Sequence, residues 1–180
     1  MDIVFLVGGR GAGKTTVGRA LARELGLPFT DMDEFLCGRA GQSVAELVAA
    51  EGWEGFRRRE CAALREAAAE AARSGVGVIA TGGGAVLDAG NRDFLRANGV
   101  VVWLSLAPET AAARLGENPE AAQRPSLTGK SMLEEVREVM EARAPLYAAC
   151  AHYAVDAALP AGEVCAAVLR HLSGGRGPRR

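Results

Sequence analysis

One glycine-rich run restricts the possible folds of this chain more than any other feature. Residues 8–15 read GGRGAGKT and fit the pattern G-x-x-x-x-G-K-[ST]. They follow a continuous apolar stretch, residues 3–7, which is typical of a central parallel strand buried on both faces. After them, Val17, Leu21 and Leu25 recur at the spacing of a helix. Strand, loop and helix in this order predict a phosphate-binding loop, or P-loop, in a parallel α/β fold.

The residue types of this loop suit a polyphosphate. Glycines let successive backbone N–H groups turn toward the ligand, and the following helix adds the positive end of its dipole. Lys14 is expected to reach the β- and γ-phosphates, and Thr15 to offer its hydroxyl to Mg²⁺. The alternative is a glycine-rich turn that binds nothing, which the flanking strand and helix disfavour.

The rest of the chain repeats the strand-then-helix pattern. Further strands are predicted near 29–30, 76–80, 100–106 and 152–155, and further helices over 33–39, 43–50, 52–73, 88–98, 108–115, 131–150 and 162–172. Ser43 and Glu46 have the spacing of a capping box, and Asn98-Gly99 that of a helix end. We predict a three-layer α/β/α sandwich on a parallel sheet, with a single domain over residues 1–172 and a disordered tail over 173–180.

Residues 116–130 interrupt this pattern between two helices. Gly, Asn, Pro, Gln, Arg and Ser replace the apolar period there, and surface loops of such length usually have a function. We expect a lid whose closure brings Arg124 over the bound phosphates. The alternative is that Arg124 is simply exposed to solvent.

The composition restricts the partners of the protein. The 21 basic and 22 acidic residues leave a net charge of −1, which gives no overall field for binding nucleic acid or an anionic membrane. No apolar run approaches the roughly 20 residues that span a bilayer, and the N-terminus does not resemble a signal peptide. Four scattered cysteines without Cys-x-x-Cys spacing predict neither a disulfide nor a metal site. We expect a cytoplasmic protein that acts as a monomer.

Two aspartates follow the second predicted strand. Asp31 and Asp33 can both project from one turn at the carboxyl edge of the sheet, where ligands of open α/β sheets bind. Asp31 is expected to act on the Mg²⁺ shell and Asp33 on a substrate hydroxyl. The alternative is that one or both cap the next helix.

An arginine-rich segment, FRRRE at residues 56–60, lies on the longest predicted helix. Arg57 and Glu60 are three residues apart, so Glu60 can fix the Arg57 guanidinium for an incoming carboxylate. The alternative is that the arginines of this segment simply form a solvent-exposed face of the helix. The glycines after Thr81 either let the backbone approach a ligand or form a simple turn. Arg143, taken alone, does not indicate a function.

Together these motifs resemble the shikimate kinase family. Their order and approximate spacing match that family over about residues 3–172, and the loop QRPSLTGK, residues 123–130, is similar to that of the second isoform in enteric bacteria. The motifs are residues 8–16, Asp31-x-Asp33, Phe56-Arg57-x-x-Glu60, residues 81–84, Arg124-Pro125-x-Leu127 and Arg143-x-x-x-Tyr147.

The resemblance implies a nucleoside-monophosphate-kinase-like fold and transfer of the γ-phosphoryl of ATP to the 3-hydroxyl of shikimate, on the route to chorismate and the aromatic amino acids. The implied catalytic residues are Lys14, Asp33 and Arg124. Thr15 and Asp31 would hold Mg²⁺. The implied nucleotide contacts are Gly9, Arg10, Gly11, Ala12, Gly13, Lys14, Thr15, Thr16 and Arg114, with Arg114 stacking on adenine. The implied shikimate contacts are Asp33, Arg57, Gly82, Gly83, Gly84 and Arg143.

Three rival functions remain open at this point. A kinase of another small hydroxy compound, such as gluconate, needs similar residues. A nucleotide acceptor would need a base-binding groove that the sequence does not indicate. A regulatory nucleotide-binding domain without catalysis is disfavoured by the presence of Lys14, Thr15, Asp31, Asp33 and Arg124.

Overall fold

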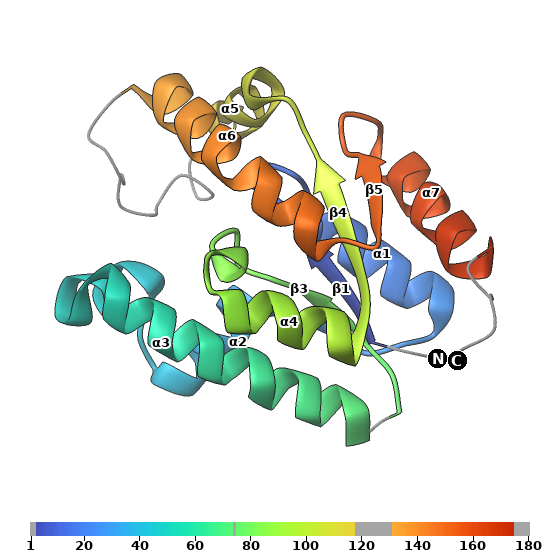
Figure 1. The fold of residues 1–180 in the computed structure, drawn as a ribbon, viewed down its shortest axis with the longest axis horizontal. Coiled ribbons are helices and arrows are strands. Elements are labelled where there is room, and N and C mark those ends of the chain that lie inside the picture. Colours follow the sequence, from blue (N-terminus) through green and yellow to red (C-terminus); the bar gives the residue numbers. More distant parts are fainter. Residues whose placement is uncertain (1–2, 74, 118–130, 175–180) are drawn as a thin grey trace.

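Five parallel strands form one sheet in the computed structural model, which describes residues 3–73, 75–117 and 131–174. The strands are β1 (Ile3–Val7), β2 (Phe29–Asp31), β3 (Val78–Ala80), β4 (Gly99–Ser105) and β5 (Tyr153–Asp156). Their order across the sheet is β2-β3-β1-β4-β5, and every neighbouring pair is parallel. The predicted parallel sheet is therefore confirmed (Figure 1).

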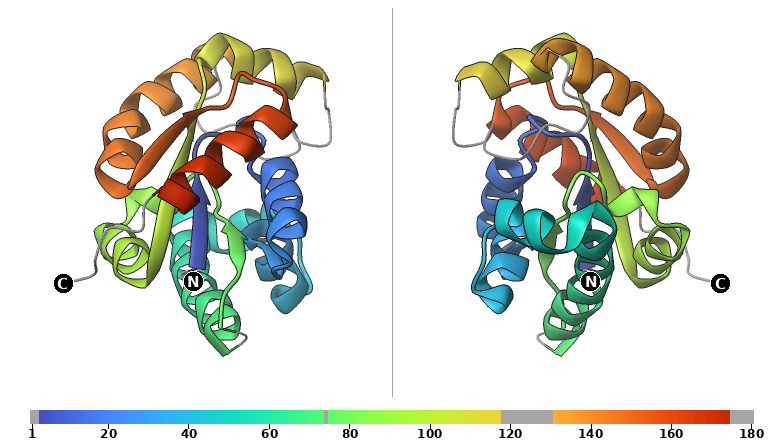
Figure 2. Two further views of the ribbon diagram at one scale, coloured as in Figure 1. Left: turned by 90° about the vertical axis from the view of Figure 1, so that its right-hand side faces the viewer. Right: turned by 90° about the vertical axis from the view of Figure 1, so that its left-hand side faces the viewer.

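Helices cover both faces of the sheet (Figure 2). They are α1 (Lys14–Leu25), α2 (Met32–Ala40), α3 (Val44–Arg73), α4 (Ala89–Asn98), α5 (Pro108–Glu117), α6 (Met132–Cys150) and α7 (Ala161–Gly174), with a 3₁₀ turn, η1, at Ala85–Leu87. One core packs Phe5 and Ile79 against α3, and the other packs Leu6 and Val102 against α1 and α7. Alternate residues of one strand thus point into different cores, which explains the continuous apolar runs. This is the predicted three-layer sandwich.

The carboxyl ends of the strands lie at one edge of the sheet, because all the strands are parallel. The P-loop follows β1, Asp31 ends β2, and the glycines at 82–84 come just after β3. Residues 157–160 follow β5 at the same edge. The topology therefore brings four separate segments of the chain to one place.

Two predicted helix ends are confirmed. Gly26 ends α1 in the left-handed region, with φ of 65°. Ser43 and Glu46 exchange the hydrogen bonds of a capping box, since the Glu46 carboxylate accepts from Ser43 N–H and the Ser43 hydroxyl accepts from Glu46 N–H. Ser131 caps α6 in the same way. Among the described residues, no helix is long and apolar enough to cross a bilayer.

Other boundaries differ from the prediction. The helix α4 ends at Asn98 with Gly99 after it, as predicted, but Gly99 has an extended φ of 179° in place of the left-handed geometry and also begins β4. The helix α5 continues through Gly116 and Glu117, so these residues do not belong to a loop. Likewise α7 continues through Ser173 and Gly174, past the expected end at residue 172. The remainder of the predicted lid, with Arg124, and of the predicted tail lies outside the described residues.

Candidate active site

The P-loop joins β1 to α1 through residues with unusual backbone geometry. Gly11 and Gly13 have φ of 75° and 78°, which side-chain-bearing residues rarely adopt. Lys14 begins α1, and its ammonium donates to the carbonyls of Gly8 and Gly9 at 2.9 and 2.8 Å. The Lys14 side chain therefore folds back over the P-loop, where it is expected to bind phosphates.

Asp31 joins this loop to the end of β2. Its Oδ2 accepts a hydrogen bond of 2.6 Å from the Thr15 hydroxyl. Its Oδ1 accepts from the backbone N–H groups of Asp33 and Glu34, at 2.9 and 3.4 Å, and so caps α2. The two alternatives for Asp31 are thus compatible, because one oxygen caps a helix while the other faces Thr15. A hydroxyl and a carboxylate oxygen so close together suit Mg²⁺, which prefers hard oxygen ligands.

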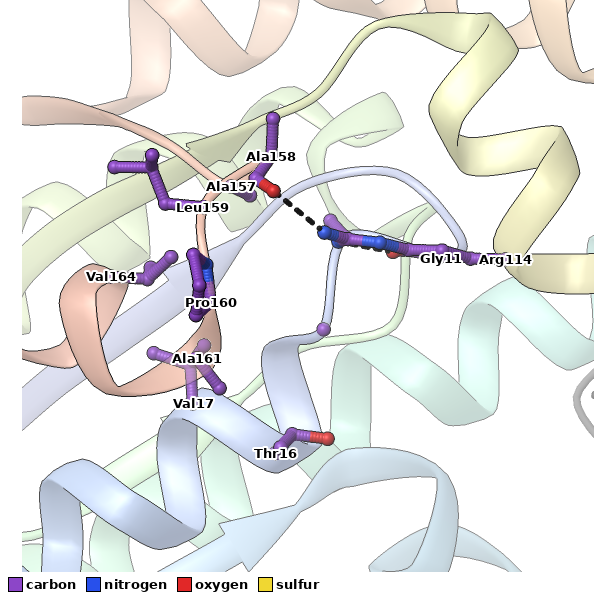
Figure 3. A pocket seen from close by; sticks show the side chains of 12 residues that line it. Gly11, Thr16, Val17, Arg114, Ala157, Ala158, Leu159, Pro160, Ala161 and Val164 are labelled. Carbon is purple, nitrogen blue, oxygen red and sulfur yellow. Dashed lines mark hydrogen bonds between the residues drawn. The ribbon is translucent and has the colours of Figure 1, made fainter.

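A cavity of about 400 Å³ opens beside the P-loop (Figure 3). Arg114 of α5 crosses it, donating to the carbonyl of Gly11 at 3.3 Å and to that of Ala158 at 3.2 Å. The guanidinium is thereby held flat between two backbone segments. Other residues around the cavity include Ala12, Gly13, Thr16, Val17, Leu159 and Pro160.

A second group of residues, which we call the acceptor side, comprises Asp33, Arg57, Glu60, Arg143 and residues 82–84. Arg57 donates to Glu60 Oε2 at 2.5 Å, as the spacing predicted. Its guanidinium also lies 5.4 Å from the centre of the Trp53 ring and 5.3 Å from that of Phe56. The arginine is therefore oriented by both charge and aromatic contact.

Glu60 is almost fully buried, at 3% exposure. Its Oε1 has no hydrogen-bond partner among the residues that the structure describes. A Cβ placed on Gly82 would overlap that oxygen and come 3.6 Å from Asp33 Oδ1. Two carboxylates thus border one small space at Gly82, where they can accept hydrogen bonds from hydroxyl groups.

Arg143 completes the acceptor side from α6. Its Nη1 donates to the carbonyl of Gly83 at 3.1 Å. Burial lowers the pKa of this guanidinium from its usual value, and the nearby positive charge of Arg57 acts in the same direction. Two partly buried arginines held near each other form a ready site for an anion.

The acceptor side abuts the P-loop. A Cβ on Gly83 would lie 3.4 Å from the carbonyl oxygen of Gly8 and 3.7 Å from the backbone nitrogen of Arg10. The structure thus brings together every predicted site residue that it describes. The glycines at 82–84 are more than a simple turn, because they touch both the arginines and the P-loop.

Sequence reasoning missed one contributor and assigned no role to another. Residues 157–160 line the cavity beside Arg114, and their position just after a strand at the carboxyl edge was the available signal. Tyr147 donates its phenol hydroxyl to the Gly83 carbonyl at 2.6 Å. Burial raises the pKa of this phenol, so it remains a donor at neutral pH.

Comparisons with known proteins identify the family of this chain. A family model described as shikimate kinase matches residues 10–173. Shikimate kinase 2 of Sodalis glossinidius is 50% identical over 169 residues, which cover 94% of each chain. Shikimate kinase of Nitratidesulfovibrio vulgaris is 56% identical over 157 residues, 87% of each chain.

A solved structure agrees as well. Shikimate kinase from Acinetobacter baumannii, in complex with shikimate, has a TM-score of 0.89 and 34% identity, covering 99% of this chain and 96% of that one. Family model, relatives and structure thus match the chain over nearly its full length. The chain belongs to the shikimate kinase family.

Proposed function

We propose that the protein transfers the γ-phosphoryl of ATP to the 3-hydroxyl of shikimate, giving shikimate 3-phosphate and ADP for the synthesis of chorismate and aromatic amino acids. One observation carries this proposal. Arg57 and Arg143 approach the same glycine segment, and that segment lies against the P-loop. A small acid with hydroxyl groups fits such a site, because its carboxylate can bind the arginines while a hydroxyl faces the phosphates.

The acceptor side would bind and orient shikimate. Arg57 and Arg143 bind the carboxylate with charge-assisted hydrogen bonds. Asp33, on the first turn of α2, accepts the hydrogen bond of the attacking hydroxyl and takes its proton. Gly82 and Gly84 leave room for Glu60 and Arg57 beside the substrate, since a Cβ at either position would overlap one of these side chains.

The nucleotide side would hold ATP for in-line transfer. Backbone N–H groups of the P-loop bind the phosphates, and Lys14 leaves the Gly8 and Gly9 carbonyls to neutralise charge on the transferring group. Arg114 stacks on the adenine within the cavity. Arg124, which lies outside the described residues, adds a second positive charge when the lid, now limited to residues 118–130, closes over the phosphates.

Thr15 and Asp31 would hold Mg²⁺. Their facing oxygen atoms support this assignment, and Mg²⁺ commonly binds one or two protein groups together with substrate phosphates. When bound, the ion neutralises phosphate charge. The other oxygen of Asp31 caps α2, the helix that carries Asp33. One residue thus holds both the metal and the start of that helix in place.

The proposal extends to the setting of the enzyme. A single domain that extends to the end of α7 at Gly174 would act as a monomer in the cytoplasm, where ATP is available. Its partners would be two small molecules, with neither nucleic acid nor membrane involved. The net charge of −1 supports this, because the anions are bound locally.

A coupled assay of ADP release tests the proposed function. The protein is given MgATP with shikimate, gluconate or AMP in parallel reactions, and the product is identified by phosphorus NMR. We expect phosphorylation of shikimate at the 3-hydroxyl and at least about a hundredfold lower kcat/KM with the other two acceptors. Faster turnover of gluconate or AMP would contradict the proposal. Sedimentation of the active protein checks the monomer.

A further inference from the structure

Tyr147 is buried at the centre of the acceptor side without being one of its charged groups. It lies on α6, one turn after Arg143, and is 2% exposed. Its ring stacks on Trp103 of β4, with 5.9 Å between ring centres and 23° between planes. A phenylalanine could make this stacking contact equally well. The hydroxyl group therefore needs a separate explanation.

That hydroxyl has one specific contact. It donates a hydrogen bond of 2.6 Å to the carbonyl of Gly83, which also accepts from Arg143 Nη1 at 3.1 Å. A carbonyl oxygen has two lone pairs, so these two donors fill its hydrogen-bonding capacity. Both donors come from α6, and together they fix the direction of the Gly83 carbonyl.

Fixing this carbonyl has a consequence at the next residue. A trans peptide is planar, so the N–H of Gly84 must point opposite to the Gly83 carbonyl, away from α6. Gly84 in turn lies directly against the guanidinium of Arg57, which a Cβ at that position would overlap. The peptide between Gly83 and Gly84 therefore contacts both arginines, Arg143 through its carbonyl and Arg57 beside Gly84, and the Tyr147 hydroxyl is one of the two side-chain donors that hold its rotation.

We propose that Tyr147 is a positioning residue for acceptor recognition: its hydroxyl holds the Gly83 carbonyl so that Arg143 and the following peptide keep the orientation in which the acceptor carboxylate binds. Tyr147 itself does not touch the acceptor. Without the hydroxyl, Arg143 is the remaining donor to Gly83 among the described residues, and the guanidinium and the peptide can turn together. This inference rests on the proposed function.

The variant Tyr147→Phe tests the inference. It keeps the stacked ring and removes the hydroxyl. We expect the KM for shikimate to rise about five- to twentyfold, with kcat within about threefold of wild type and the dissociation constant for MgATP unchanged. The matched control is Tyr153→Phe, the other tyrosine of the chain, which stacks on His171 at 4.8 Å and should leave the shikimate KM unchanged.

Two further measurements separate positioning from general stability. Thermal melting of Tyr147→Phe shows whether the fold is weakened. The same substitution in an Arg143→Lys background should raise the shikimate KM less than it does alone, because both residues act on one carbonyl.

A lower melting temperature with an unchanged shikimate KM would overturn the inference, and so would an equal rise in the KM for ATP. Wild-type protein is assayed first with shikimate. Inactive wild-type protein contradicts the proposed function, whereas active wild-type protein with an unaffected Tyr147→Phe variant contradicts this inference alone.

Discussion

The P-loop takes its shape from one continuous run of residues, whereas the acceptor side is assembled from α2, α3, residues 82–84 and α6. Glycines occur in both, for different reasons. Gly13 has φ of 78° with no atom within 4 Å of the place where a Cβ would be, so it is needed for its backbone conformation. Gly84 has φ of −100°, which any residue adopts, but a Cβ would overlap Arg57. It is needed for space.

This difference suggests how each half can be damaged. The P-loop depends on local backbone geometry, so changes there should affect ATP. The acceptor side depends on contacts between distant segments, so changes there should affect shikimate and leave ATP binding intact. The following predictions test that separation, from the largest expected effect to the smallest.

Asp33→Asn should have the largest effect. The amide keeps the shape of the side chain but cannot accept the proton of the attacking hydroxyl, so kcat should fall by about 10²–10⁴. The dissociation constant for MgATP, measured by calorimetry, should stay near that of wild type. Glu34→Gln, an exposed neighbour that pairs with Arg19, is the matched control. Normal turnover of Asp33→Asn would remove the residue from the mechanism.

Arg57→Lys should weaken shikimate binding by about ten- to a hundredfold. A lysine cannot reproduce the planar fork that pairs with Glu60 and an acceptor carboxylate together. Arg58→Lys is the control, because Arg58 pairs with Glu54 at 2.8 Å and its side chain is 69% exposed. Binding of shikimate and of ATP is measured separately. Equal loss for both ligands would indicate that Arg57 is structural.

Gly84→Ala and Gly13→Ala test the two uses of glycine directly. The added Cβ at Gly84 must displace the Arg57 guanidinium, so the shikimate KM should rise about tenfold with little change for ATP. Gly13→Ala strains the backbone by about 1–2 kcal/mol and should mainly raise the ATP KM. Gly38→Ala, in α2 with open space around it, is the control for both. If both substitutions raised the KM of the same substrate, the distinction between the two uses of glycine would be wrong.

Asp31→Asn should change the dependence of the rate on Mg²⁺. Asparagine caps helices as well as aspartate does, so α2 and Asp33 should keep their places. The carboxylate that faces Thr15 is lost, and the Mg²⁺ concentration for half-maximal rate should rise about fivefold. A magnesium titration identical to that of wild type would mean that Asp31 serves only as a cap.

The sequence predicted the fold and the strand, glycine loop and helix around Lys14 well because their signals are local. A buried apolar run, a loop motif and a helix end each occupy a few neighbouring residues. The pairing of Arg57 with Glu60 was predictable for the same reason, since three residues separate the partners along one helix. The role of Asp31 was only partly predictable, because capping a helix and facing the metal site are each enough to explain an aspartate at this position.

The contacts made by distant residues were not predictable in this way. Tyr147 donates to a carbonyl 64 residues away in the sequence, and no spacing pattern predicts a hydrogen bond to a backbone oxygen. The cavity wall at residues 157–160 contains mostly small apolar side chains, so its position rather than its composition identifies it. The role of Gly84 likewise depends on which side chain packs against it in the folded chain.

The smallest predicted effect concerns a bend within α3. Gly52 has φ of 68° and ψ of 175°, which breaks the helix one residue before Trp53. Across this bend, Arg59 Nε donates to the Glu51 carboxylate at 2.9 Å. Residues eight apart in a straight helix are separated by about 12 Å along its axis, so this pair depends on the bend. We expect the Glu51–Arg59 pair to stabilise the turn that carries Trp53 and Arg57.

Because both side chains are exposed, Glu51→Gln should raise the shikimate KM less than about threefold at pH 7. The hydrogen bond from Arg59 lowers the pKa of the Glu51 carboxyl, so the pair stabilises the folded protein above about pH 4.5 and is lost as pH falls through the lowered pKa. Melting temperatures of wild type and variant should therefore differ at pH 7 and converge in acid. Glu54→Gln, whose partner Arg58 lies on the same side of the bend, should leave the KM unchanged. An equal change in both variants would show that the bend holds its shape without the pair.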